Sequence, residues 1–234
     1  MKIVSWNVLH IVHEKNYVGP ESLVITEYPD ESVRVGKIID YIKNLYDKSD
    51  NIVINLQEVP GDIFDGLTKV ISPEHFTYHT YQRVTSMKNK NRMNPYFNMN
   101  ESLVTILKGS KIISTTVTEF ESGKAALINK LNNKLLIYNV HMPFKYASTV
   151  KITDRAIICG DFNCDMNEAE TIFPGFTSFT NHNNTFITRR NNLINIAKYD
   201  YIMTNFNTTH SDLLVDKIDL SDHYPISSTL YNVV

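Results

Sequence analysis

The stretch that decides the fold is residues 157–163, Ile-Ile-Cys-Gly-Asp-Phe-Asn. An apolar run ends there in Gly160, which lets the backbone bend at little steric cost. Side chains at i and i+2 of a strand share a face, so Asp161 and Asn163 are predicted to line one cleft at the end of a buried strand. The same residues are also typical of an ordinary turn formed through Asp and Asn side chains. The rest of the chain decides between these interpretations.

The chain before this stretch predicts an α/β fold whose middle part is an antiparallel meander. Strands and helices alternate over the first 70 residues, which is the pattern of an α/β domain, and short strands then follow one another up to His141. Asn132-Asn133 indicates a hairpin, because Asn tolerates the positive φ that such turns need. The expected elements are strands at 2–9 and 51–56, a loop to residue 31, a helix through 46 with Ser32 as its N-cap, a helix from Pro60 through 70, and strands at 75–82, 101–107, 111–120, 124–131 and 134–140.

The C-terminal part is predicted to add an asparagine-rich loop and the last strands. We expect extended segments around 177–179, a polar loop through Arg189-Arg190, and strands at 198–204, 207–215 and 225–231. There is no repeat and no linker, so residues 1–234 are predicted to form a single domain.

Composition excludes several classes of protein. The chain is 42% hydrophobic with a net charge of -2, so no global basicity indicates nucleic acid or membrane binding, and a polyanion must be held locally or through a metal. Cys159 and Cys164 do not form a zinc motif or a disulfide framework. No signal peptide or ~20-residue apolar span is present. We therefore expect an intracellular protein, cytoplasmic or nuclear.

Polar side chains recur where apolar runs end. Each has a structural interpretation of its own, such as a turn, a helix start or a loop histidine. Strand ends on one edge of a sheet converge in space, however, and one shared site explains all of them together. These residues are Asn7, Glu58, His141, Asp161, Asn163, Asp200 and Asp222-His223.

The residue types favour one chemistry. Carboxylates and carboxamides without a soft ligand set suit Mg²⁺, with Mn²⁺ as the alternative. Two histidines provide proton transfer near neutral pH. Together they predict metal-assisted attack of water on a phosphoryl group. No Gly-x-Ser-x-Gly or Gly-x-x-x-x-Gly-Lys motif supports a serine hydrolase or a nucleoside triphosphatase.

Six short motifs in this order resemble the endonuclease/exonuclease/phosphatase superfamily. The resemblance runs from Trp6 to Pro225, is greatest to the deoxyribonuclease I-like members, and extends in part to the deadenylase branch. It implies a four-layer α/β sandwich, in which two mixed β-sheets pack face to face and are flanked by helices. The motifs are Trp6-Asn7-Val8, Leu56-Gln57-Glu58-Val59, Asn139-Val140-His141, Gly160-Asp161-Phe162-Asn163, Tyr199-Asp200-Tyr201-Ile202 and Ser221-Asp222-His223-Tyr224-Pro225.

The resemblance also implies a role for each motif residue. Glu58 would be the principal Mg²⁺ ligand, with Asn7 beside it and Asp222 assisting the metal or water. Asp161 and Asn163 would orient the nucleophilic water and the scissile phosphate. Asp200 would hold His223, His141 would be the second catalytic histidine, and Glu101 would be the carboxylate partner of His141.

The last of these roles makes a specific geometric prediction. Glu101 and His141 are expected to form a carboxylate–histidine pair that faces the Asp200–His223 pair across the scissile phosphate. A buried carboxylate beside His141 would raise the pKa of that histidine and keep it cationic near neutral pH. The alternative is that Glu101 is a surface residue that opens its strand.

One departure from the family pattern leaves part of a sheet less covered, or covered by a partner. Only 19 residues separate His141 from Asp161, where members of the family usually have a helix. The connection is too short for a full crossover helix with its loops, so one flanking helix is predicted to be missing.

Three functions remain open at this point. A nucleic-acid phosphodiesterase is favoured by a basic loop beside Tyr96 and Phe97, which suits backbone charges and stacked bases, although a solvated connector explains that loop almost as well. A phosphatase of phosphoinositides or other small phosphate esters is the second, and a catalytically inactive binding protein on the same fold is the third. The proposed substrate contacts are Arg83, Lys88, Lys90, Arg92, Arg189 and Arg190.

Overall fold

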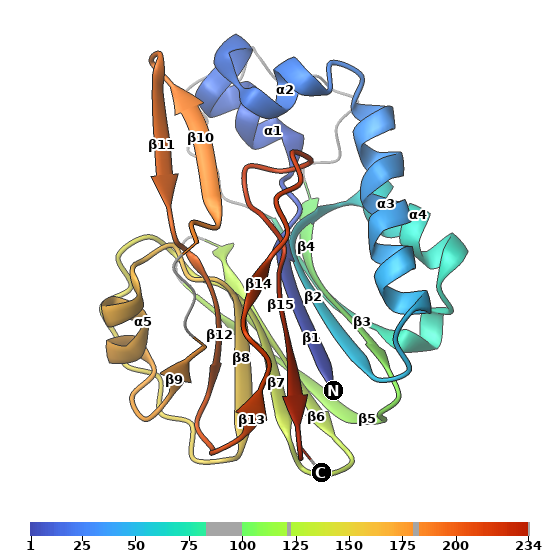
Figure 1. The fold of residues 1–234 in the computed structure, drawn as a ribbon, viewed down its shortest axis with the longest axis vertical. Helices are drawn as coiled ribbons and strands as arrows, with labels where there is room; N and C mark the ends of the chain where they lie inside the picture. Colours follow the sequence, from blue (N-terminus) through green and yellow to red (C-terminus); the bar gives the residue numbers. More distant parts are fainter. Residues whose placement is uncertain (83–99, 121–122, 180–182, 234) are drawn as a thin grey trace.

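Two β-sheets packed face to face form the centre of the molecule (Figure 1). The computed structural model describes residues 1–82, 100–120, 123–179 and 183–233. The predicted substrate contacts Arg83, Lys88, Lys90 and Arg92 lie outside the described residues, as do Tyr96 and Phe97.

The first sheet has the order β13-β15-β1-β2-β4-β3, and β14 also pairs with β15. Strands β1 and β2 are parallel, and the other neighbours are antiparallel. Its strands are β1 (Lys2–Asn7), β2 (Ile52–Pro60), β3 (Phe76–Gln82), β4 (Asn100–Lys108), β13 (Thr209–His210), β14 (Leu214–Val215) and β15 (Ile226–Tyr231). The strand predicted at 207–215 is therefore only two short pieces.

The second sheet has the order β5-β6-β7-β8-β12-β9, with β7 and β8 parallel. Its strands are β5 (Ile112–Glu119), β6 (Ala125–Leu131), β7 (Leu136–His141), β8 (Ala156–Asp161), β9 (Thr177–Ser178) and β12 (Asp200–Thr204). Each sheet therefore contains one parallel pair, and these two pairs carry Asn7, Glu58, His141 and Asp161 of the predicted site.

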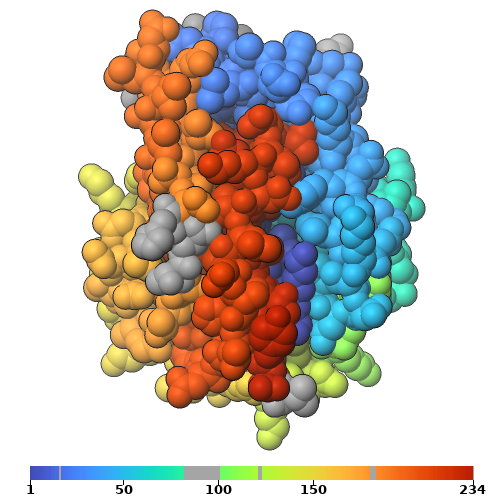
Figure 2. All heavy atoms as spheres, in the orientation of Figure 1, coloured from blue at the N-terminus to red at the C-terminus, as the bar shows by residue number. Residues whose placement is uncertain are grey.

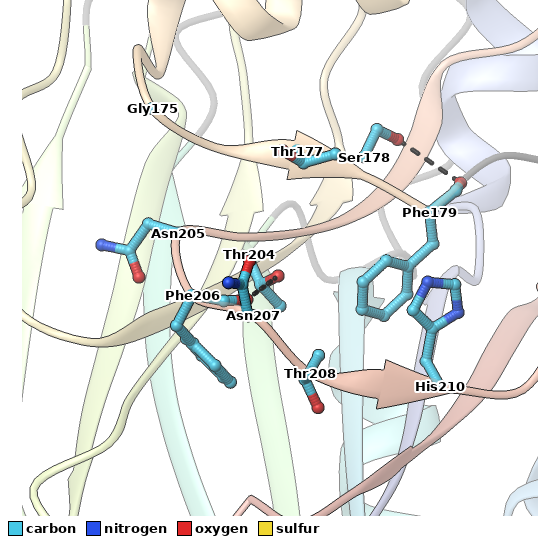
Figure 3. Close-up of a pocket in the computed structure, with 10 residues that line it drawn as sticks. All are labelled: Gly175, Thr177, Ser178, Phe179, Thr204, Asn205, Phe206, Asn207, Thr208 and His210. Atoms are coloured by element: carbon cyan, nitrogen blue, oxygen red, sulfur yellow. Dashed lines mark hydrogen bonds between the residues drawn. The ribbon is translucent and has the colours of Figure 1, made fainter.

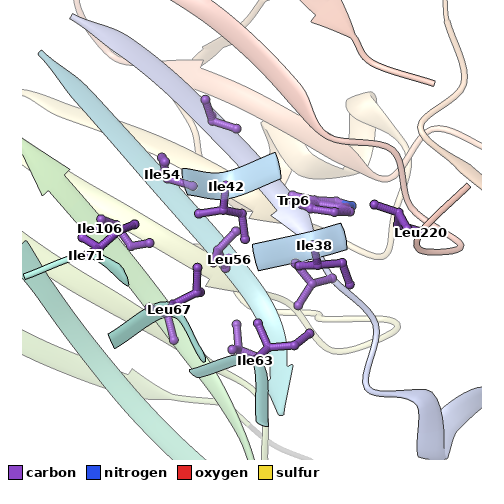
Figure 4. Close-up of a cluster of buried hydrophobic side chains, with 14 of the residues drawn as sticks. Trp6, Ile38, Ile42, Ile54, Leu56, Ile63, Leu67, Ile71, Ile106 and Leu220 are labelled. Atoms are coloured by element: carbon purple, nitrogen blue, oxygen red, sulfur yellow. The ribbon is translucent and has the colours of Figure 1, made fainter. Parts of the chain in front are cut away.

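Alternation along the strands separates the layers, because successive side chains point to opposite faces. In β1, Ile3 belongs to the core between the sheets, whereas Val4 packs on the helix side. That outer face is covered by α3 (Glu31–Asp47) and α4 (Gly61–Val70), whose buried isoleucine and leucine side chains lie over β2 (Figure 4). Asp30, rather than the predicted Ser32, caps α3, and its carboxylate accepts a hydrogen bond from the Ser32 N–H at 3.0 Å.

The outer face of the second sheet confirms the missing crossover helix. Residues 142–155, all described, contain no helix or strand, although they join the parallel strands β7 and β8. Tyr146, Val150 and Ile152 from this segment pack against the outer apolar cluster of the sheet. The short helix α5 (Met166–Ile172) covers the remainder, so the fold is a four-layer α/β sandwich with one thin outer layer.

The segment between β1 and α3 is helical, and the predicted loop there is wrong. It contains α1 (Ile11–His13), the π-helical turn η1 (Glu14–Val18), the 3₁₀ turn η2 (Gly19–Glu21) and α2 (Leu23–Glu27). A further 3₁₀ turn, η3 (Pro73–His75), precedes β3. Leu9, Ile11 and Val24 form a small buried cluster that anchors the segment. Each helix is too short for a 3.6-residue periodicity to be visible in the sequence.

The polar loop predicted through Arg189-Arg190 is instead a hairpin of β10 (Phe186–Arg190) and β11 (Leu193–Ala197). Asn191 and Asn192 form its turn with φ of 53° and 61°, the positive values of a type I′ turn. The hairpin rises beside the helices of residues 11–27 (Figure 2). None of the helices in the described part of the chain is long and apolar enough to cross a membrane.

Candidate active site

The ends of strands from both sheets converge on one edge of the molecule. The carboxyl ends of the two parallel pairs carry Asn7, Glu58, His141 and Asp161. Asp200 opens β12 and lies directly opposite Asp161 in the antiparallel register. Because both sheets end at this edge, residues up to 217 positions apart meet there, as the 3.0 Å hydrogen bond from Trp6 Nε1 to the His223 carbonyl shows.

Two backbone features place the carboxylates. Glu58 lies in a β-bulge of β2 between Leu56 and Val59 and has a φ of 53°. A bulge re-aims a side chain, and a non-glycine residue with positive φ is a strained conformation typical of functional sites. Gly160 has a φ of 153°, and a Cβ there would lie 1.9 Å from the carbonyl oxygen of Val140. Only glycine lets β8 approach β7 this closely before Asp161.

Asp161 is the centre of the site. Its Oδ2 accepts a hydrogen bond from Asn7 Nδ2 at 3.1 Å and lies 3.5 Å from His141 Nε2 and 3.7 Å from His223 Nε2. Its Oδ1 accepts the backbone N–H of Asn163 at 3.0 Å. The carboxylate is almost fully buried. One oxygen therefore faces an amide and two imidazoles, which is an arrangement suited to orienting a small polar molecule.

The Asp200–His223 pair is confirmed. His223 Nδ1 lies 2.9 Å from Asp200 Oδ2, and both residues are buried. Burial alone would lower the pKa of His223, but the carboxylates of Asp200 and Asp161 raise it well above the ordinary histidine value. The Asp200 carboxylate therefore favours the protonated form of this imidazole, whose Nε2 faces Asp161.

Residues that the sequence did not indicate hold this pair in place. Thr185 Oγ1 accepts a hydrogen bond from the backbone N–H of Asp200 at 3.2 Å. Ser221 Oγ donates to the Asn7 carbonyl at 2.7 Å and accepts the N–H of His223 at 3.1 Å. Phe186, at the base of the hairpin, places its ring 4.8 Å from the His223 ring. Ser and Thr are too common for any of these to be found by pattern.

A buried arginine fixes the loops that carry the metal-binding candidates. Arg34 of α3 is fully buried, and Nη1 donates to the carbonyls of Val8 and Leu220 at 2.9 and 2.7 Å. Its charge is balanced by Glu31 at 2.6 Å. A buried cation that is paired and fully hydrogen-bonded fixes its surroundings firmly. Arg34 thus joins the loop after Asn7 to the loop before Asp222.

The predicted pair of Glu101 and His141 is wrong. Glu101 Oε2 lies 2.7 Å from Nε2 of His13, and His141 Nδ1 lies 2.8 Å from the Tyr81 hydroxyl. Glu101 is nonetheless almost fully buried and at the site, so it is not a surface residue. The residues between the first strand and the first long helix are predicted to be a loop, so the pattern does not indicate His13 as a partner of Glu101. Tyr81 was one of several tyrosines in a predicted strand, with nothing to distinguish it.

Asp222 and Asn163 complete the predicted set. Asp222 is half-buried, and burial, together with the nearby carboxylates of Glu14, Glu58 and Asp161, raises its pKa to about 7, against the opposing effect of His223. The side chain of Asn163 donates from Nδ2 to the carbonyl of Met142 at 3.0 Å. In this arrangement the Asn163 amide group stabilises the end of β7.

The donor set fits a divalent cation. The ligand atoms of Glu58, His141 and Asp161 lie within 4.8 Å of one another. Several carboxylates concentrated in a buried space repel one another and favour a bound cation; burial and, to a lesser degree, this repulsion raise the pKa of Asp222. Oxygen ligands with few nitrogens suit Mg²⁺ or Mn²⁺.

The two predicted substrate arginines in the described part of the chain lie away from this cluster. Arg189 and Arg190 are at the tip end of β10, whereas Phe186 at its other end contacts His223. Arg190 lies four positions further along the strand than Phe186, which is roughly 13 Å at ~3.3 Å per residue. The arginines therefore flank the site and do not enter it.

A separate pocket of about 360 Å³ lies at the other end of the second sheet (Figure 3). Its lining includes Thr204, at the end of β12 opposite to Asp200, and the stacked rings of Phe179 and His210. None of the predicted site residues lines it. We assign it no part in the chemistry of the cluster.

No protein-family model and no curated protein matches the sequence. The fold, in contrast, matches solved structures over nearly the whole chain. TDP2 from Caenorhabditis elegans has a TM-score of 0.64 at 13% identity, covering 99% of this chain and 74% of that one. ANGEL2, described as a 2′,3′-cyclic phosphatase in complex with adenosine-2′,3′-vanadate, has a TM-score of 0.67 at 13% identity, covering 97% and 94%.

A bacterial structure gives the same result. The endonuclease/exonuclease/phosphatase from Bacteroides vulgatus has a TM-score of 0.63 at 14% identity and covers 98% of each chain. At such low identity the likeness concerns architecture, and it agrees with the two packed sheets and the order of motifs in this chain. The chain therefore has the fold of the endonuclease/exonuclease/phosphatase superfamily.

Proposed function

We propose that the chain is a Mg²⁺-dependent phosphodiesterase that hydrolyses nucleic acid. The observation that carries the proposal is the position of Asp161, one of whose oxygens faces Asn7, His141 and His223 within 3.7 Å. A buried carboxylate between two imidazoles, next to a second carboxylate in a strained bulge, suits hydrolysis of a phosphate ester better than a purely structural role.

The metal is assigned to the Glu58 side of the site. Glu58, with Asn7 and Asp222, would hold Mg²⁺, and the ion when bound would offset the negative charge of the scissile phosphate. His141 and Asp161, whose ligand atoms also lie near Glu58, are assigned to the leaving group and the water and not to the ion. Burial, together with the neighbouring carboxylates, raises the pKa of Asp222, and a cation at this position favours its ionised form. His10 contributes its backbone N–H to Glu58 Oε2 at 3.4 Å and helps to fix the carboxylate.

The remaining residues act on the water, the phosphate and the leaving group. Asp161, oriented by the Asn7 amide and the Asn163 N–H, accepts a proton from the attacking water. His223, held cationic by Asp200, donates from Nε2 to a phosphate oxygen. His141, oriented through Nδ1 by Tyr81, acts in its protonated form and gives the Nε2 proton to the leaving oxygen as the P–O bond to that oxygen breaks. Such positioned acid–base groups contribute about 10²–10⁴-fold each.

Nucleic acid is favoured as the substrate by the surroundings of the site. The hairpin places an aromatic ring, Phe186, at the His223 end and two cations, Arg189 and Arg190, further along the same strand. Aromatic rings that stack on bases and cations that follow a phosphate backbone are the usual elements of single-strand binding. A fold relative, TDP2 from D. rerio, was solved with a single-strand DNA product at 14% identity and a TM-score of 0.63.

An activity panel tests the proposal. Purified protein is incubated with labelled single- and double-stranded DNA and RNA, with a 2′,3′-cyclic nucleotide and with an inositol phosphate, each in Mg²⁺ and in EDTA. We expect Mg²⁺-dependent cleavage of oligonucleotides and loss of cleavage in Asp161→Asn. Turnover of only the small esters would favour the phosphatase alternative. Binding of oligonucleotides without turnover of any substrate would favour an inactive binding protein.

A further inference from the structure

The segment after β1 brings a histidine to the back of the Glu58 carboxylate. His13 Nε2 lies 3.6 Å from Glu58 Oε2, while the other oxygen, Oε1, lies 3.5 Å from His141 Nε2. The two oxygens of Glu58 therefore face two different groups of ligand-type side chains. One group contains His141 and Asp161, and the other contains His13 and Glu101.

The second group is compact and inside the protein. The ligand atoms of His13, Glu58 and Glu101 lie within 4.8 Å of one another. Glu101 has 1% of its surface exposed, and the His13 side chain 12%. His13 Nε2 lies 2.7 Å from Glu101 Oε2 and 3.6 Å from Glu58 Oε2. Two ligand atoms bound to the same metal ion by bonds of ~2.1 Å lie roughly 3–3.4 Å apart, which is close to these distances.

A simple ion pair does not account for the arrangement. Nε2 of His13 carries at most one proton, yet two carboxylates converge on it, and only Glu101 lies within hydrogen-bond distance. Glu101 Oε1 is also buried and has no hydrogen-bond partner in the described part of the chain. Buried carboxylate oxygens are costly when unpaired. A divalent cation with a neutral imidazole balances both charges and supplies the missing partner.

We propose that His13, Glu58 and Glu101 form a second metal site, which takes a divalent transition-metal ion and shares the Glu58 carboxylate with the Mg²⁺ site. One imidazole among carboxylates suits ions of the Mn²⁺-to-Zn²⁺ series better than Mg²⁺, which favours oxygen ligands and retained water. The π-helical turn that begins at Glu14, directly after His13, is a feature frequent at functional sites. The proposal deepens the proposed function because it uses Glu58, but its test measures metal binding alone.

Calorimetric titration of the metal-free protein with Mn²⁺, and separately with Zn²⁺, tests the site without measuring activity. We expect His13→Ala and Glu101→Gln each to lose one binding event of the wild-type protein, or to weaken it by at least about tenfold. His141→Ala should keep that event. His210→Ala is the matched control, because it removes a histidine that stacks on Phe179 away from the cluster.

Pulsed electron paramagnetic resonance of the bound Mn²⁺ identifies the ligand. Nitrogen modulation from a coordinated imidazole should persist in His141→Ala and disappear in His13→Ala, with circular dichroism confirming that both variants are folded. Unchanged stoichiometry and affinity in folded His13→Ala or Glu101→Gln would overturn the second site. If the second site fails while EDTA still abolishes cleavage, the proposed function stands. If the site is present and no substrate is cleaved, the proposed function fails alone.

Discussion

The two histidine–carboxylate pairs of the site are built in opposite ways. Asp200 and His223 lie 23 positions apart, at the start of β12 and just before β15, and the ordered sheet edge holds them. His13 and Glu101 lie 88 positions apart, and the histidine comes from a helix of three residues. A sheet edge reproduces its geometry in any chain with the same strand order. A short irregular segment depends on its own local sequence, so the position of His13 is set by residues 8–27 and not by the strand order.

Loss of Glu58 or of the metal should have the largest effect, because Glu58 lies between the His13–Glu101 pair and His141. EDTA should abolish cleavage, Mg²⁺ or Mn²⁺ should restore it, and Glu58→Gln should strongly raise the metal concentration needed for half-maximal rate. Initial rates over a metal titration measure this. Full activity in EDTA would show that neither side of the site works through a cation.

Asp200→Asn affects only the pair held by the sheet edge. We expect kcat to fall by about 10²–10⁴-fold, because the imidazole of His223 loses the group that orients and charges it. The variant should keep its fold, since the amide can still accept a hydrogen bond from Nδ1. Steady-state kinetics with circular dichroism as the folding control give the answer. A kcat within about twofold of wild type would remove Asp200 from the proposed chemistry.

The same pair predicts how stability depends on pH. The folded-state pKa of His223 lies above its unfolded value, so its contribution is fully present below about pH 6.5 and is lost as pH rises through the folded pKa. The free energy of unfolding in EDTA should therefore decrease above pH 6.5. Urea denaturation at several pH values measures it, and Asp200→Asn should flatten the decrease. An equal slope in the variant would show that the charge of His223 does not depend on Asp200.

Tyr81→Phe examines the histidine that belongs to neither pair. Removing the hydroxyl that orients His141 costs one net hydrogen bond, about 0.5–1.5 kcal/mol, which corresponds to roughly 2- to 10-fold in kcat. Tyr78→Phe, an exposed tyrosine on the same strand, is the matched control. In a double-mutant cycle, Tyr81→Phe should have no further effect on His141→Ala. Additive losses would mean that Tyr81 acts on something else.

Arg190→Ala should have the smallest effect, because it lies beyond both pairs. We expect weaker oligonucleotide binding with kcat unchanged, and a salt dependence of log affinity reduced by about 1. Arg155, which stacks on Phe206 at 4.2 Å, provides the control substitution. Fluorescence anisotropy at several salt concentrations measures the oligonucleotide affinity of Arg190→Ala and its dependence on salt. An unchanged salt slope would place the nucleic-acid path elsewhere.

Two asparagine pairs illustrate how far local patterns extend. Asn132-Asn133 predicted a hairpin correctly, but the positive φ there belongs to Lys134. Asn191-Asn192 adopts the expected type I′ values, yet the surrounding polar residues led to the prediction of a loop. A turn signal is local, whereas the strands on either side of it are stabilised by contacts that the sequence does not display.

By its residue pattern alone the sequence determined an α/β fold with a meander, and the two packed sheets were implied by the resemblance of its motifs. Apolar runs that end in Asn7, Glu58, His141 and Asp161 place these residues at strand ends, and the parallel neighbours within one sheet end at a common edge. Only the tertiary structure decided the partners. Glu101 pairs with His13 and not with His141. His13 lies in a three-residue helix after β1, next to the bulge that holds Glu58, and neither feature is visible in the sequence. Periodicity describes which face a residue takes, and side-chain partners are decided by packing between segments far apart in the chain.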